Sequence, residues 1–193
     1  FEQKEYEEAY QWLNRSANQN HAPAQNSLGL LCDYGKGCER NPLSALDWYQ
    51  RAGNHAQALF NLGMLYFLGD GIEPDEQKAF SCFERSANEN ETRAQVFLGI
   101  LYENGRGVTQ DLSRAVSGYR KAAWQGDAFA QFHLARMYYH GKGVGLDHGQ
   151  ALHWYLKAAD QGYSLAQYNL GRMYLNGEGT QIDIENAIHW FQK

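Results

Sequence analysis

Apolar and small residues recur along this chain in one arrangement that repeats five times. In the fourth copy, Ala130, Leu134, Met137 and Tyr138 fall at the three- and four-residue spacing of a helix with one buried face. Gly141 then ends that helix, because glycine adopts left-handed backbone angles without penalty. A second stripe follows, made of Ala151, Trp154, Tyr155, Ala158 and Ala159. Each copy is therefore predicted to be a pair of antiparallel helices, here called helix A and helix B.

The period of this pattern predicts the architecture. Each copy begins at an Ala-Gln or Ala-Leu pair, and the steps between these alanines are 34, 36, 36 and 36 residues. The alanines are Ala24, Ala58, Ala94, Ala130 and Ala166. A fixed period in this range is typical of solenoids, in which each unit buries its apolar face against its neighbours. We predict an all-α solenoid with five A helices, six B helices and no β-sheet.

One polar residue marks the expected start of every complete or partial B helix after the first. An asparagine or aspartate stands four residues before the first B-helix alanine in all five copies. These residues are Asn41, Asp75, Asp111, Asp147 and Asp183. Such a side chain accepts a backbone N–H at the helix start and stabilises the helix by about 1 kcal/mol. We therefore predict five B helices that begin directly after these caps.

A small residue recurs in the middle of every A helix. It is glycine at Gly29, Gly63, Gly99 and Gly171, and alanine at Ala135. A glycine inside a helix costs about 1 kcal/mol relative to alanine, so its recurrence indicates that a side chain would not fit. We expect helix B to approach closely here, with its alanine pairs as the counterpart.

The motif that carries these features is A-Q-x-x-L-G-x-x-Y-x-x-G-x-G-V, followed by D-x-x-x-A-x-x-W/Y-Y-x-x-A-A-x-x-G. Residues 166–179 show its first half without interruption. The motif resembles the Sel1-like repeat, a relative of the tetratricopeptide repeat with slightly longer units, and the resemblance covers nearly the whole chain. It implies a right-handed α/α superhelix that serves as an adaptor or scaffold in protein complexes, with helix A on the concave side. It names no partner.

The repeat boundaries follow from aligning the copies. We predict a single array over residues 1–193, in which residues 1–22 form the B helix of a truncated repeat. The complete repeats are 23–56, 57–92, 93–128 and 129–164, and residues 165–193 form a repeat truncated in its B helix. Terminal units of solenoids carry polar outer faces, and neither end supplies one. We expect either a piece of a longer array or ends covered by another copy of the chain.

Charge and composition exclude some partners and leave others open. The net charge of −5 gives no basic footprint for nucleic acid. No apolar run approaches the roughly 20 residues that span a bilayer, which argues against direct membrane insertion. The three cysteines, Cys32, Cys38 and Cys82, are too few and too irregular for a disulfide framework and are expected to fill small apolar spaces. The compartment is left open between export and the cytoplasm.

Catalytic and cofactor signatures are missing from the sequence. It contains no S-x-x-K, G-x-S-x-G, H-E-x-x-H or Walker motif. The Gly-x-Gly turns follow helices rather than strands, so helix termination explains them better than phosphate binding does. His133 and His140 lie two turns apart, but no third ligand joins them at sensible spacing. We predict no catalysis, no cofactor and no metal.

The third, seventh and tenth positions of each A helix face away from its buried stripe and are the candidate partner-binding positions. The predicted binding residues are Phe60, Met64, Phe67, Phe132, Arg136, Tyr139, Tyr168, Arg172 and Leu175. Aromatic residues and arginines are enriched at binding hot spots. Two alternatives stay open, because the apolar positions also suit packing between repeats, and the two arginines either clamp an acidic peptide or form local ion pairs.

The function predicted from these observations is a non-catalytic scaffold or adaptor that binds a peptide or domain along the helix-A groove. One alternative is a self-assembling structural module that stacks through its uncapped ends. Another is a cell-wall or β-lactam-related module, as in cysteine-rich relatives of this repeat, against which the missing S-x-x-K motif counts.

Overall fold

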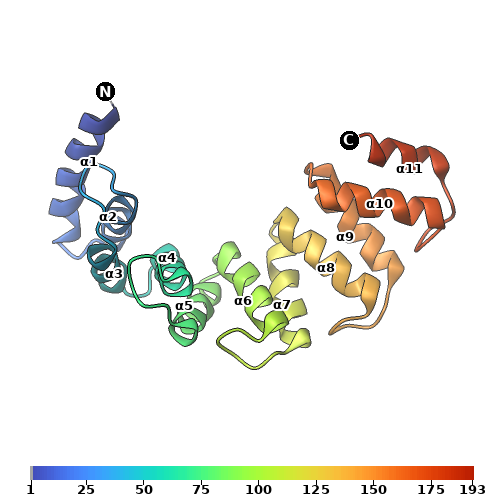
Figure 1. Cartoon of the computed structure of the whole chain (residues 1–193), viewed down its shortest axis with the longest axis horizontal. Helices are drawn as coiled ribbons and strands as arrows, with labels where there is room; N and C mark the ends of the chain where they lie inside the picture. Colours follow the sequence, from blue (N-terminus) through green and yellow to red (C-terminus); the bar gives the residue numbers. More distant parts are fainter. Residues whose placement is uncertain (1) are drawn as a thin grey trace. The chain divides into compact units, whose positions relative to one another are not determined.

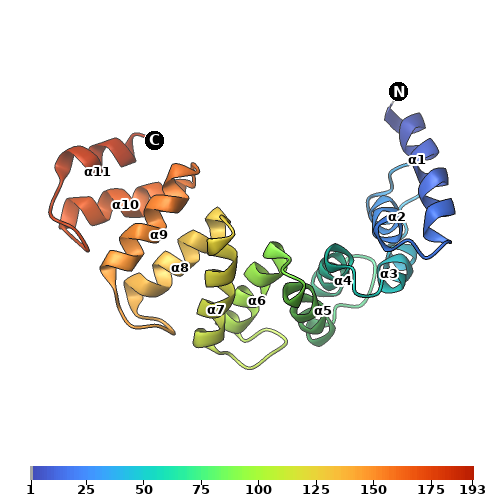
Figure 2. The same ribbon diagram turned by 180° about the vertical axis from the view of Figure 1, so that it is seen from behind.

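The computed structural model describes residues 2–193, and within that range it holds eleven α-helices and no strand. Figures 1 and 2 show them in order from two opposite sides. They are α1 (Glu2–Ala17), α2 (Ala22–Tyr34), α3 (Pro42–Arg51), α4 (Ala56–Leu68), α5 (Glu76–Asn88), α6 (Thr92–Asn104), α7 (Leu112–Trp124), α8 (Ala128–His140), α9 (His148–Asp160), α10 (Ser164–Asn176) and α11 (Ile184–Phe191). The even-numbered helices are the five A helices and the odd-numbered ones are the six B helices. The prediction of an all-α repeat fold is confirmed.

The chain divides into two compact units, the first ending at Ala94 and the second running from Gln95 to Lys193. Unit 1 contains α1 to α5, and unit 2 contains α7 to α11, while α6 contributes residues to both. Inside each unit, an A helix packs against the B helix that follows it and the B helix that precedes it, as in the pairs α2 with α3, α4 with α5, α8 with α9 and α10 with α11. Each unit is thus a stack of helix pairs.

The predicted caps start their helices as expected. The side chain of Asp147 accepts the backbone N–H of Gln150, and the other four predicted caps do the same three residues onward. Gly141 ends α8 with φ of 63°. Two residues later, Gly143 is held against α7, and a Cβ there would lie 2.3 Å from the carbonyl oxygen of Leu112. The second glycine of this turn is therefore required by contact as well as by backbone angle.

The glycine inside each A helix does meet helix B, but the partner differs from the expected one. A Cβ on Gly99 would lie 2.6 Å from the Tyr119 ring, and one on Gly29 would lie 2.5 Å from the Tyr49 ring. Gly63 and Gly171 face Phe83 and Phe191 in the same way. The expectation that alanine pairs are the counterpart was wrong, because a flat aromatic ring fills the space that the missing side chain leaves.

The glutamine of the Ala-Gln pair joins successive repeats. Gln25 Nε2 donates to the carbonyl oxygen of Ala17 at 3.0 Å, at the end of the preceding B helix. Gln131 and Gln167 donate in the same way to the preceding B helix. All three side chains are buried, and each adds a second hydrogen bond to a helix-end carbonyl that also accepts a backbone N–H.

Candidate protein-interaction groove

A groove of about 570 Å³ lies in unit 1 and is lined mainly by α2 and α4. Its walls include apolar side chains at the seventh position of each helix, Leu30 and Met64, and the ring of Phe60. Across the groove, Asn61 Nδ2 donates to Asn26 Oδ1 at 2.9 Å. The volume falls in the range of ordinary ligand sites, and apolar walls with a few polar groups are typical of them.

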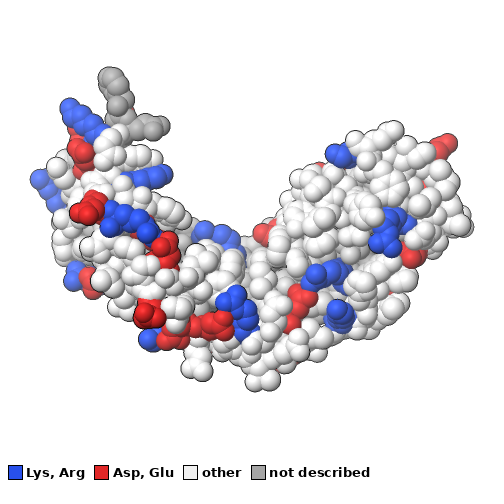
Figure 3. All heavy atoms as spheres, in the orientation of Figure 1, with Lys and Arg blue, Asp and Glu red and all other residues white. Residues whose placement is uncertain are grey.

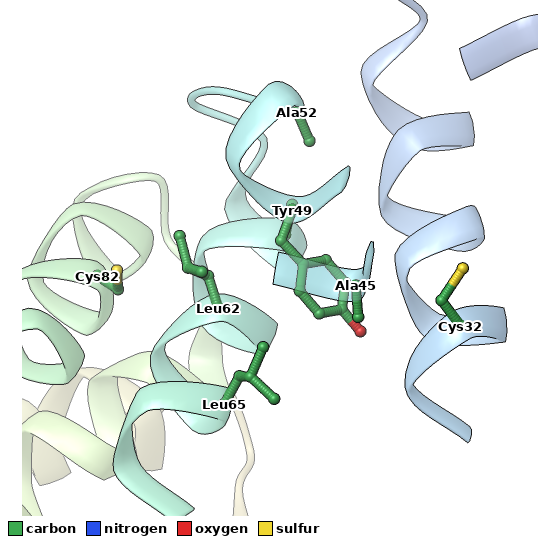
Figure 4. Packing of buried hydrophobic residues seen from close by; sticks show 8 residues of the cluster. Cys32, Ala45, Tyr49, Ala52, Leu62, Leu65 and Cys82 are labelled. Carbon is green, nitrogen blue, oxygen red and sulfur yellow. The ribbon is translucent and has the colours of Figure 1, made fainter. Parts of the chain in front are cut away.

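Tyr49 of α3 lies at the floor of this groove. Its side chain is fully buried, and its hydroxyl has no hydrogen-bond partner among the described residues. Figure 4 shows the ring placed between Cys32 on α2 and Leu62 and Leu65 on α4. Burial, with Asp33 nearby, raises the pKa of the Tyr49 hydroxyl above its ordinary value. A buried hydroxyl without a partner costs roughly 1–3 kcal/mol, so this group is unusual in a native core.

Two carboxylates share a single arginine at one end of the groove. Arg40 donates from Nη2 to Asp70 Oδ2 at 2.6 Å and from Nε to the backbone oxygen of Asp33 at 2.8 Å. The same guanidinium stays 3.9 Å from the Asp33 carboxylate, which accepts no hydrogen bond from residues 2–193. Burial raises the pKa of Asp33, Arg40 opposes this, and Asp70 adds to it. The Asp33 carboxylate is therefore incompletely compensated.

At the equivalent positions of unit 2, a network of hydrogen bonds surrounds Glu103, and His133 Nδ1 beside it has no hydrogen-bond partner among the described residues. Tyr119 Oη donates to Glu103 Oε2 at 2.7 Å, and Arg136 of the next A helix donates to Glu103 Oε1. The His133 ring stacks on Tyr119, and its Nδ1 lies 3.8 Å from Glu103 Oε2, which is too long for a hydrogen bond. The pKa of Glu103 is lowered to about 2. The His133 imidazole contributes most to this shift, and the Tyr119 hydrogen bond and the Arg136 charge add to it, so that together they outweigh the effect of burial.

The predicted binding residues of unit 1 divide between core and groove. Phe60 is buried and packs on Phe83 with 5.6 Å between the ring centroids. The Arg93 guanidinium lies over the Phe60 ring, 4.3 Å from its centroid. Met64 is half-buried in the groove wall. Phe67 is half-buried and makes an edge contact with Phe83. Most of the Phe60 side chain therefore serves packing within unit 1, which is one of the two alternatives left open by the sequence.

The predicted residues of α8 are largely occupied by contacts within unit 2. Phe132 is buried and packs on Tyr155 and Tyr163. Arg136 makes the local ion pair with Glu103, and Tyr139 Oη donates to Glu178 Oε2 at 2.8 Å. The Arg136 guanidinium is already engaged inside the protein.

The predicted residues of α10 are exposed. Tyr168 packs on one side against Phe191, and Leu175 is open to solvent. Arg172 is exposed and forms no ion pair with residues 2–193. A role for these three residues in partner binding stays a prediction.

Sequence reasoning placed Asp33 among the candidate helix-A positions but not among the predicted binding residues, and it did not single out Tyr49, Asp70 or Arg40. The signal that could have found them is a comparison of equivalent repeat positions. Asp33 stands where Glu103 stands in unit 2, and the following seventh position changes from Arg136 to Met64. The first change replaces the acceptor of the tyrosine hydroxyl, and the second removes the arginine that pairs with that acceptor.

The structure also bears on metal binding and on the cysteines. Within residues 2–193, no group of three or more His, Cys, Asp or Glu side chains is placed to hold a metal ion. Cys32 and Cys82 are buried free thiols. Burial, together with the neighbouring Cys38, raises the pKa of Cys32 to about 12.

No described helix combines the length and apolarity that crossing a membrane requires. Charged side chains of both signs are interspersed over the face that Figure 3 shows.

These features define the class of an α-helical repeat protein built from helix pairs. The chain belongs to the Sel1 repeat family, whose sequence profile matches it six times. The matches cover residues 2–21, 22–55, 56–91, 92–127, 128–163 and 164–193. Repeat proteins of this family generally act as protein-interaction modules on a non-catalytic scaffold.

Solved structures with this fold are similar over 66% to 98% of the chain. A Sel1 repeat protein from Oxalobacter formigenes is 33% identical with a TM-score of 0.93, covering 98% of this chain and 79% of that one. The protective antigen c5321 of uropathogenic Escherichia coli is 33% identical with a TM-score of 0.92, covering 94% and 39%. Cysteine rich protein B of Helicobacter pylori is 28% identical with a TM-score of 0.55, covering 66% and 92%.

A curated relative matches over a shorter stretch. The chitin synthase regulator SKT5 of Saccharomyces cerevisiae is 44% identical over 50 residues, which is 26% of this chain. This chain spans 7% of the length of that regulator and 39% of the length of the E. coli antigen.

Proposed function

We propose that this chain is a non-catalytic scaffold that binds a partner peptide or domain along the face formed by its A helices. The observation that carries the proposal is the groove of unit 1, where two successive A helices leave about 570 Å³ between apolar walls and unmatched polar groups. A surface of this kind suits an extended segment, because it offers apolar contact and hydrogen bonding together.

The exposed part of α10 is a separate candidate surface within unit 2. Tyr168 and Leu175 are large apolar side chains that are 55% and 44% exposed, and Arg172 beside them has a free guanidinium. Aromatic side chains and arginines of this kind carry much of the energy of protein interfaces. Arg136 does not join them as an anion clamp, since Glu103 already holds it.

A selection from a random-peptide display library on the intact chain tests the proposal. We expect enriched peptides whose binding is weakened at least tenfold by Met64→Glu, which places a charge in the groove wall. The matched control is Leu43→Glu on α3, because Leu43 is 65% exposed and does not line the groove. Failure to enrich any peptide, or equal loss with both variants, would contradict the proposal.

Self-assembly is the second candidate, and one observation favours it. Helix α11 exposes Ile184, Ile188 and Phe191, each 45–50% accessible. Light scattering over a hundredfold range of protein concentration separates the two candidates. A mass that rises with concentration, and that Ile188→Glu returns to the monomer value, would support self-assembly.

A further inference from the structure

The groove of unit 1 contains two polar groups whose partners are missing. The Tyr49 hydroxyl is a buried donor without an acceptor, and the neighbouring Asp33 carboxylate receives no hydrogen bond from the described residues. Both residues line the groove. Native proteins rarely leave a buried hydroxyl such as that of Tyr49 unmatched. The Asp33 side chain is 23% exposed, so its carboxylate can still accept hydrogen bonds from a partner, and the two groups together mark a place that a partner would complete.

Unit 2 shows what a completed site of this type contains. At the equivalent positions, the Glu103 carboxylate accepts from the Tyr119 hydroxyl and from the Arg136 guanidinium. Arg136 enters from the seventh position of the next A helix. In unit 1 that position is Met64, whose side chain cannot donate a hydrogen bond. The third member of the trio is therefore a guanidinium in unit 2 and is lacking in unit 1.

The charges around the unit 1 groove favour a cation at this place. Arg40 is drawn to Asp70 at 2.6 Å, which leaves the Asp33 carboxylate 3.9 Å from the same guanidinium. The other arginine of the groove, Arg93, already pairs with Glu91 at 2.7 Å and lies over the Phe60 ring. Two carboxylates thus share one cation at the Asp33 end, and a further positive charge would be complementary to it.

We propose that the groove of unit 1 binds an arginine side chain of an extended partner segment against Asp33, in the place that Arg136 takes in unit 2. The guanidinium donates to the Asp33 carboxylate, and its methylene stem lies along Leu30 and Met64. This inference rests on the proposed function and gives the partner its chemistry.

The planar guanidinium suits this place better than an acidic or neutral side chain does. It donates several hydrogen bonds in a fixed plane and is weakly hydrated, so it enters a partly buried site at lower cost than an ammonium. Hydrogen bonds to a charged acceptor are also about twice as strong as neutral ones. An acidic segment would face Asp33 and Asp70 and would be repelled.

Methionine-methyl NMR of the intact chain tests the site directly. The sequence has three methionines, of which Met64 lines the groove while Met137 and Met173 are buried in unit 2 and serve as internal references. The probe is N-acetyl-arginine N-methylamide. Its comparators are the citrulline analogue, which keeps the shape without the charge, and the glutamate analogue.

We expect the arginine probe to shift the Met64 methyl signal saturably while the Met137 and Met173 signals stay in place. The citrulline analogue should bind at least tenfold more weakly. Asp33→Asn should weaken the arginine probe by about tenfold, whereas Glu103→Gln, the matched change in unit 2, should leave the Met64 response unchanged. If Asp33→Asn does not fold, Met64→Arg fills the site from within and should abolish the shifts of the Leu30 and Asn61 amide signals.

Three results would overturn the inference. They are equal binding of the arginine and citrulline probes, binding of the glutamate probe in preference to arginine, or no Met64 shift at tens of millimolar arginine probe. Peptides selected on the groove without arginine enrichment, together with a silent probe, would remove this inference and leave the proposed function standing. A specific arginine response with no selected peptide would remove the proposed peptide-binding function and leave the arginine site standing.

Discussion

The two units use the same three repeat positions in different ways. In unit 2, Glu103, Tyr119 and Arg136 satisfy one another inside the protein. In unit 1, Asp33 and Met64 occupy the positions of Glu103 and Arg136, and the Tyr49 hydroxyl has no described partner. The aromatic ring, the glycine beneath it and the helix pairing are the same in both. The same helix pairing thus occurs with and without the polar network, and the two sites differ at the positions of Asp33 and Met64.

The largest predicted effect concerns the part that both units share. Gly99→Leu places a side chain where a Cβ alone would lie 2.6 Å from the Tyr119 ring. Overpacking at this contact should destabilise unit 2 by about 3 kcal/mol. Thermal unfolding followed by circular dichroism checks the expectation, and an unchanged melting temperature would contradict it.

Gly99→Ala is the control for this variant. The fourth repeat carries a fully buried Ala135 at the equivalent position, so the repeat fold accommodates one methyl group there. We expect the alanine variant to lose far less stability than the leucine variant. Equal losses would mean that the glycine is needed for a reason other than the ring.

The second effect concerns the hydrogen-bond network around Glu103 and its dependence on pH. The folded protein lowers the pKa of Glu103 from its ordinary 4.5 to about 2. A lowered pKa stabilises the folded state above pH 4.5, and this contribution of about 3 kcal/mol is lost as the pH falls from 4.5 towards 2. Glu103→Gln should remove the contribution at neutral pH and flatten this part of the stability curve. Urea denaturation at several pH values measures it.

Asp33→Asn is the comparison in unit 1. Burial raises the pKa of Asp33, so its carboxylate supplies no comparable stabilisation at neutral pH. The variant should therefore change the stability of unit 1 by much less than Glu103→Gln changes that of unit 2. A larger loss in unit 1 would show that the Asp33 end of the groove is satisfied in the free protein.

The third effect is a gain of stability on closing the groove. The double variant Asp33→Glu with Met64→Arg rebuilds the unit 2 trio around Tyr49. We expect unit 1 to gain about 1–2 kcal/mol, because a buried hydroxyl acquires a charged acceptor. Hydrogen exchange of the α2 and α4 backbone amides measures this gain in the local stability of unit 1. Faster exchange in the double variant than in the parent chain would count against equivalent geometry in the two units.

The sequence predicted the repeat period, the helix pairs and their caps because each depends on local rules. An aspartate at the start of a helix or a glycine at its end acts within one turn, as Asp147 and Gly141 do. The ring over Gly99 was missed, since small residues on helix B looked like the natural counterpart. The role of Gln131 was missed because the residue contacts a carbonyl of the preceding repeat.

The candidate site could be predicted only in part, since burial and pairing are decided between helices. Phe60 and Arg136 look like binding residues by type and position, yet the structure uses the first for packing and the second for an ion pair. The unmatched Tyr49 hydroxyl has no sequence signature of its own. It becomes visible only when Asp33 and Met64 are compared with their counterparts one unit further along.

The matched pair Tyr49→Phe and Tyr119→Phe tests the difference between the units most directly. Both variants remove one hydroxyl from a ring that packs over a helix-A glycine, and local stability is measured by hydrogen exchange in each unit. We predict that Tyr119→Phe costs about 1.5 kcal/mol, because it removes a hydrogen bond to a carboxylate, whereas Tyr49→Phe is neutral or stabilising. Equal losses in the two units would contradict an open, unmatched groove in unit 1.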